Sequence, residues 1–296
     1  MPATAATLLP ADFLRKLDQL TVRSRRIYRG SMRGERRSRT QGRGMEFSDY
    51  RSYQAGDDYR YIDWNIYSRL DRLFIKLFSE EEDINVHLVL DASASMAWGS
   101  PAKLEYAARI AAAIGYVGLT NFDRVGAATF SDRLHQTLLP QRSRGHILRL
   151  FEFLASAGGG GRSDLAAAMR DYVHLTPRRG LLVVVSDLLL PNGFEEGLKL
   201  ARYHHFEPFL IQVLSDDELF PALDGDLRLL DRESHAPVDV TADGPALEAY
   251  ARARDGYFAE IEQFCLRHQI DYLRTSTATP FEDLILRYLR IGGLFA

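Results

Sequence analysis

From residue 84 onward, short apolar runs alternate with longer segments whose apolar residues recur every three or four positions. Runs typical of buried strands stand at 84–90, 123–130, 181–185 and 208–214, and helical patterns separate them. The pair Ser100 and Pro101 is predicted to begin the first of these helices. Such alternation is typical of parallel strands joined by crossover helices. We therefore predict an α/β fold with a doubly wound, mainly parallel sheet flanked by helices.

The alternation is interrupted once and then resumes. Two short apolar runs bracket a polar stretch at 232–237, which predicts a hairpin insertion near 226–242. A long helix, a last strand and a closing helix are then expected at 245–268, 270–274 and 281–290. Residues 84–296 are thus predicted to form one doubly wound α/β domain with one inserted hairpin.

The first 83 residues differ in pattern from the rest. Between Arg15 and Arg43 lie eleven basic residues against two acids. Residues 1–43 are therefore expected to be a basic N-terminal arm, either solvated or in electrostatic contact with an acidic partner or polyanion. Short-period apolar patterns at 44–83 predict a small β extension. Its acids within 56–64 are interpreted as turn residues and ion-pair partners of Arg51, Arg60 or Arg69.

Composition narrows the classes of function. The formal net charge is −3, which makes nucleic acid an unlikely partner for the chain as a whole. Apolar runs fall short of the roughly 18 residues of a membrane span, so none is expected. The single cysteine, Cys265, cannot form an internal disulfide. A cytoplasmic protein is expected, without a phosphate-binding loop of its own.

Oxygen-bearing side chains follow the predicted strands where those strands end. Asp91, Ser93 and Ser95 come after the strand 84–90, Ser163 follows a glycine run, and Asp187 follows the strand 181–185. Carboxyl ends of parallel strands meet at one edge of a sheet. Oxygen ligands favour Mg²⁺, Mn²⁺ or Ca²⁺. The sequence predicts a Mg²⁺ site (or Mn²⁺/Ca²⁺) there; a simple strand-end turn, whose side chains cap backbone N–H groups, is the alternative.

The same residues, in this order, resemble the metal-ion-dependent adhesion site of von Willebrand factor type A domains. The segments 44–47, 51–53, 55–64 and 88–96 are similar to the signature of the bacterial family called domain of unknown function number fifty-eight. The resemblance implies that Ser93 and Ser95 bind the metal directly, whereas Asp91 and Asp187 act mainly through bound water. The family pattern has Thr where this chain has Ser163, which keeps the hydroxyl but loses a rotamer-fixing methyl.

The resemblance also implies a function and a partner. Members of this family are similar to proteins that act as partners of MoxR-type AAA+ ATPases. We therefore expect a non-enzymatic, Mg²⁺-dependent protein-interaction module that has no small-molecule substrate. A protein partner would supply an Asp or Glu carboxylate to the metal. The expected role is the assembly or activation of other proteins together with the ATPase.

Two other functions compete with this one. A metal-dependent phosphohydrolase could use Asp91 at a strand tip, but such enzymes need a second Asp where this chain has Ser93, and no lysine is evidently placed to hold a phosphoryl group. A polyanion-binding protein could use the basic arm, with affinity that falls steeply with salt. Tyr28 is the only aromatic residue between Arg15 and Arg43, which disfavours stacking on single strands.

Overall fold

The computed structural model describes residues 8–20, 22, 45–54, 57–80, 84–190, 193–288 and 294. They belong to two compact units. The main unit combines Met1–Ser24 with Ile84–Ala296, and the small unit is Arg25–Asp83.

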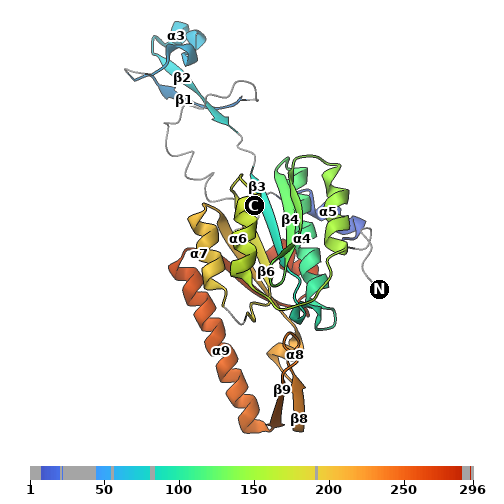
Figure 1. Cartoon of the computed structure of the whole chain (residues 1–296). Coiled ribbons are helices and arrows are strands. Elements are labelled where there is room, and N and C mark those ends of the chain that lie inside the picture. The colour runs from blue at the N-terminus through green and yellow to red at the C-terminus, as the bar shows by residue number, and fades with distance from the viewer. Residues whose placement is uncertain are drawn as a thin grey trace. The chain divides into compact units, whose positions relative to one another are not determined.

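The main unit is built on one six-stranded sheet. Its strands are β3 (Asn85–Asp91), β4 (Arg124–Phe130), β5 (Leu134–Gln141), β6 (Leu181–Ser186), β7 (Glu207–Leu214) and β10 (Asp271–Ser276). They lie in the order β10-β7-β6-β3-β4-β5, and all neighbours are parallel except β4 and β5 (Figure 1). The predicted α/β fold class is confirmed. The antiparallel edge strand β5 was not predicted, because none of its residues is buried and one of them is Pro140.

Helices cover both faces of this sheet. Alternate residues of β3 point to opposite faces, so Leu88 packs in one apolar cluster and Val89 in the other. The first face is covered by α1 (Ala11–Leu17), α4 (Lys103–Thr120), α5 (His146–Ala155), α10 (Phe281–Asp283) and η4 (Leu284–Tyr288). The second is covered by α6 (Leu165–Leu175), α7 (Glu195–Tyr203) and α9 (Gly244–Arg267). In the described part of the chain, no helix has both the length and the apolar character to cross a membrane.

Part of the predicted basic arm is a packed element of the main unit. Phe13 and Leu17, one helical turn apart on α1, are buried in the same apolar cluster as α4. The ring of Phe13 lies 5.2 Å from that of Phe281. The expectation of a solvated arm is therefore wrong for residues 8–20 and 22, because their apolar side chains outweigh their charge. Residues 23–43 lie outside the described part of the chain.

A hairpin stands beyond the carboxyl edge of the sheet. Strands β8 (Gly225–Leu230) and β9 (Pro237–Ala242) pair antiparallel after the short helix α8 (Asp216–Leu219). Figure 1 shows the hairpin beside the first turns of α9. The buried residues of α9 all lie in its C-terminal half: Phe258, Ile261, Phe264 and Cys265.

The small unit is an antiparallel pair, β1 (Met45–Ser52) and β2 (Phe74–Glu80), with η2 (Tyr59–Tyr61) and α3 (Trp64–Leu70) between them. Three of its acids, Asp57, Asp58 and Asp63, have structural partners. Asp63 caps α3 by accepting from Asn65 N and Ile66 N. Arg51 pairs with Asp57 at 2.9 Å, and Arg60 pairs with Asp58 at 2.6 Å. The interpretation of these acids as turn and ion-pair residues is confirmed for Asp57 and Asp58, while α3 was not predicted.

Candidate metal centre

The carboxyl ends of β3 and β6 lie side by side at the centre of the sheet. The chain continues from β3 to β4 on one side and from β6 to β7 on the other, so the strand order reverses between β3 and β6. Such a reversal separates the two crossover connections and leaves space above the strand ends, where ligands collect in α/β proteins. Asp91 ends β3, and Ser186 ends β6 directly before Asp187.

Asp91 is fully buried and accepts three hydrogen bonds. Its Oδ1 accepts from the Ser93 amide at 2.9 Å. Its Oδ2 accepts from the hydroxyls of Ser163 at 2.9 Å and Ser186 at 2.7 Å. Burial and the charge of Asp187 raise the pKa of Asp91 to about 6, although the Ser186 and Ser93 hydrogen bonds oppose that rise. Both oxygens of this carboxylate are thereby fixed in place.

Two hydroxyls are spaced as ligands of one metal ion. The Oγ atoms of Ser93 and Ser95 lie 3.0 Å apart. Adjacent oxygens of an octahedral Mg²⁺ complex are also about 3.0 Å apart, because each lies about 2.1 Å from the metal. Among the described residues, no three His, Cys, Asp or Glu side chains are grouped to hold a metal, so binding here would depend on hydroxyls. The donor set fits a hard cation such as Mg²⁺, Mn²⁺ or Ca²⁺.

The glycine run brings Ser163 to the same place. The Ala94 amide donates to Gly161 O at 3.0 Å, and the Gly160 amide donates to Ala92 O at 2.7 Å. Gly161 has a φ of +78°, a backbone conformation that glycine adopts readily because it has no Cβ atom. These bonds hold the loop before α6 against the loop after β3. Asp164 is the N-cap of α6 and accepts from the Ala167 amide at 2.8 Å, which leaves Ser163 as the residue directed at Asp91.

Asp187 lies in a buried ion-pair network that the sequence did not reveal. Its Oδ1 accepts from the Leu189 amide at 3.0 Å, and its Oδ2 accepts from Lys103 Nζ at 2.7 Å. Lys103 also donates to Glu218 of α8. Burial lowers the pKa of Lys103, but the two carboxylates outweigh that effect and raise it above the usual value. Nothing in the sequence indicated that a lysine lies beside the site, although Lys103 is bonded to one of the predicted ligands.

Lys103 was missed because the start of its helix was placed too early. The helix α4 begins at Lys103 itself, with Ala102 at the N-cap, rather than at Ser100 and Pro101. The Lys103 amide donates to Trp98 O at 2.9 Å. Lysine in the first turn of a helix is normally a surface residue, since the helix dipole disfavours a cation there. Only the neighbouring carboxylates explain its burial.

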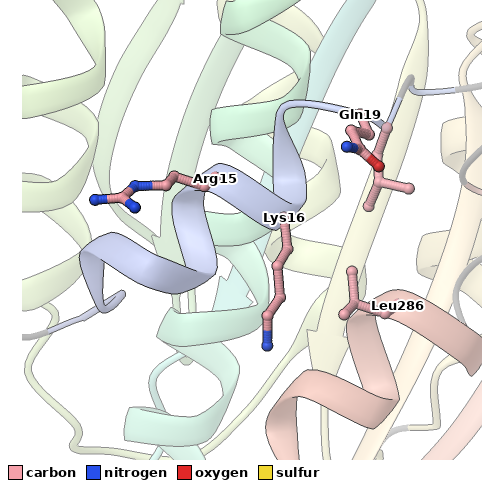
Figure 2. Close-up of a pocket in the computed structure, with 5 residues that line it drawn as sticks. Arg15, Lys16, Gln19 and Leu286 are labelled. Carbon is pink, nitrogen blue, oxygen red and sulfur yellow. The ribbon is translucent and has the colours of Figure 1, made fainter.

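The structure thus gathers the predicted residues Asp91, Ser93, Ser95 and Ser163 into one hydrogen-bonded group, with Asp187 close enough to act on Asp91. A separate surface pocket lies between α1 and η4, and Figure 2 shows Arg15, Lys16, Gln19 and Leu286 around it. None of the predicted metal ligands lines that pocket. The strand-end group is therefore the stronger candidate site.

Comparisons with known proteins identify the family of the chain. The family model described as "Protein of unknown function DUF58" matches residues 49–256. Uncharacterised proteins of Mycobacterium bovis and Mycobacterium tuberculosis are each 30% identical to the chain over 257 residues, covering 85% of this chain and 80% of the relative.

Two solved structures are similar at lower identity. The conserved hypothetical protein BatB of Bacteroides thetaiotaomicron is 18% identical, with a TM-score of 0.44, and the match covers 71% of this chain and 98% of BatB. Proximal thread matrix protein 1 of the mussel byssus, in a form with a zinc-occupied MIDAS motif, is 16% identical, with a TM-score of 0.37. The match covers 44% of this chain and 36% of the mussel protein.

Proposed function

The chain belongs to the DUF58 family, and from that premise we propose that it is a non-enzymatic, Mg²⁺-dependent protein-interaction module. Its partner docks an Asp or Glu carboxylate on the metal. The partner proposed from the family resemblance is a MoxR-type AAA+ ATPase, with which the chain acts in the assembly or activation of other proteins.

The observation that carries this proposal is the 3.0 Å separation of the Ser93 and Ser95 hydroxyls beside a buried carboxylate. Neutral hydroxyls as direct ligands leave a bound Mg²⁺ with much of its positive charge and with exchangeable waters. The chain's own residues hold the ion: Ser93, Ser95 and Ser163 offer oxygens, and Asp91 and Asp187 supply negative charge around it. A carboxylate from a partner can then replace a water.

The contacts of Asp91 disfavour the phosphohydrolase alternative. A nucleophilic carboxylate needs a free oxygen that a substrate can reach, whereas Asp91 is fully buried and accepts bonds at both oxygens. Lys103 is bonded to Asp187 and Glu218, which leaves it poorly placed to contact a phosphoryl group. The group therefore supports ion binding better than covalent catalysis.

Capture of the ATPase by the immobilised full chain tests the proposal. In Mg²⁺ the ATPase should be retained, and EDTA or Ser95→Ala should reduce retention at least about tenfold, as loss of a metal-site contact does. Ser156→Ala, at the exposed C-cap of α5, is the matched control and should behave as the unaltered chain. Ser95→Ala is preferred to Asp91→Ala, because losing the Asp91 carboxylate strands three buried donors. The proposal would be falsified if the ATPase were retained equally in Mg²⁺ and in EDTA, and equally by the Ser95→Ala and Ser156→Ala variants.

A further inference from the structure

One more carboxylate reaches this site, from a distant part of the chain. Glu233 lies in the turn between β8, which ends at Leu230, and β9, which begins at Pro237. Its Oε2 accepts from the backbone amide of Ser163 at 3.3 Å, across 70 residues of sequence. The turn therefore folds back over the carboxyl edge of the sheet, next to a residue of the proposed metal site.

The turn is fastened in that position by its own contacts. Asp231 Oδ1 accepts from the Glu233 amide at 3.2 Å, and the Asp231 amide donates to Ala236 O at 3.0 Å. The guanidinium of Arg232 lies 5.2 Å from the centre of the Trp98 ring. Trp98 directly follows η3 (Ser95–Ala97), the helical turn that begins with a proposed metal ligand. Hydrogen bonds within the turn and the contact between Arg232 and Trp98 together fix the position of Glu233.

One oxygen of the Glu233 carboxylate lacks a hydrogen bond within the part of the chain that the structure describes. That oxygen, Oε1, is buried. Burial raises the pKa of Glu233; the Ser163 amide and the Ser95 hydroxyl oppose that rise, and the charge of Asp187 adds to it. A carboxylate with one buried oxygen that accepts no hydrogen bond, near a second carboxylate, is unfavourable unless a cation lies close to both. Lys103, the cation paired with Asp187, is also bonded to Glu218.

We propose that Glu233 is an internal ligand of the metal site, whose carboxylate takes the coordination position that a partner's acid must occupy. The inference rests on the proposed function. It makes the β8–β9 turn an autoinhibitory element: a partner gains access to the metal only by displacing Glu233. Docking is then governed by competition between two carboxylates of the same chemistry, one of them in the same chain and therefore at high effective concentration.

Manganese binding by the full chain tests this directly. The probe is Mn²⁺ alone, with affinity and the number of exchangeable bound waters measured by water-proton relaxation. Glu233→Ala and Glu233→Gln should each weaken Mn²⁺ binding about tenfold and add one bound water, because one protein ligand is lost. At saturating Mn²⁺, acetate should bind the two variants about tenfold more tightly, because its internal competitor is gone.

Asp239→Asn is the matched control. Asp239 lies on the same hairpin, is exposed and pairs with Arg228 at 3.7 Å, so its loss should change none of these values. Unchanged affinity, water count and acetate binding in both Glu233 variants would overturn the inference; if Ser95→Ala still abolishes Mn²⁺ binding, the metal site itself stands. Failure of the unaltered chain to bind Mn²⁺ would overturn the proposed function and this inference together.

Discussion

The interaction between Lys103 and Asp187 is the residue-level feature with the largest expected effect on stability. Lys103 is fully buried between Asp187 and Glu218. Lys103→Met leaves these carboxylates without their cation, so we expect a loss of about 3–5 kcal/mol in the free energy of unfolding in EDTA. Mg²⁺ should restore part of that loss, because the ion supplies positive charge near Asp187. Denaturant titrations with and without Mg²⁺ measure both effects.

A surface lysine provides the matched control for this prediction. Lys16 pairs with Glu282, and both side chains are 51% exposed. Lys16→Met should cost at most about 1 kcal/mol, because water screens an exposed pair. Similar losses in the Lys103 and Lys16 variants would contradict the view that the buried pair neutralises the site.

His87 gives the main unit a predictable response to acid. It is fully buried on β3, and its Nδ1 lies 2.8 Å from the Tyr172 hydroxyl. Burial lowers the pKa of His87 from 6.5 to about 4. The unfolded chain therefore takes up a proton on this residue below pH 6.5, whereas the folded chain does not until about pH 4. The neutral, buried His87 therefore contributes about 3 kcal/mol to the free energy of unfolding above pH 6.5. This contribution is lost as the pH falls from 6.5 toward 4.

The variant His87→Gln should lack this part of the acid response. Its unfolding free energy should fall less steeply than that of the unaltered chain between pH 6.5 and 4. The variant His174→Gln, at the exposed end of α6, serves as the histidine control. Thermal unfolding across this pH range provides the measurement. Parallel slopes for the His87 variant and the unaltered chain would refute the assignment.

Local spacing predicted some members of the candidate site and concealed others. Asp91, Ser93 and Ser95 follow one strand within five residues, so the pattern alone places them together. Lys103 and Glu233 carry no such signal, because each becomes part of the site only through tertiary contacts. Nothing in the polar stretch 232–237 distinguishes a turn that folds onto the sheet from one that is surrounded by water.

At the scale of elements, the buried strands and the amphipathic helices were predictable, and the short or exposed elements were not. The strand β6 is buried throughout, so its apolar run is unambiguous. The helices α1 and α3 have seven residues each, too few for a clear periodic pattern. The edge strand β5 exposes much of its surface, which leaves its composition close to that of a loop.

Two glycines illustrate how packing between elements sets tolerance to substitution. A Cβ at Gly180, directly before β6, would clash with the backbone oxygen of Asn85, which must then move. Gly180→Ala should therefore cost about 1–3 kcal/mol. Gly256 lies within α9, and a Cβ there would meet nothing within 4 Å, so Gly256→Ala should stabilise by about 0.5–1 kcal/mol. Melting temperatures should move in opposite directions; a shared direction would contradict this difference in packing.

At the scale of the whole molecule, the division into two units predicts where metal binding is felt. All proposed ligands lie in the main unit, whereas β1 and β2 belong to the small unit. A ligand that binds only the folded state stabilises it by about 2.7 kcal/mol at one hundred times its dissociation constant. Mg²⁺ should therefore slow amide hydrogen exchange in the main unit, most strongly at residues 91–97, 160–164, 186–189 and 231–236. Exchange in β1 and β2 should be unchanged, which makes the small unit an internal control.

Two variants separate the parts of this effect. Ser95→Ala should abolish the Mg²⁺ effect on exchange, and Glu233→Ala should remove it from residues 231–236 while the other three segments stay protected. Equal protection of both units would show that the ion acts on the chain generally and not at this site.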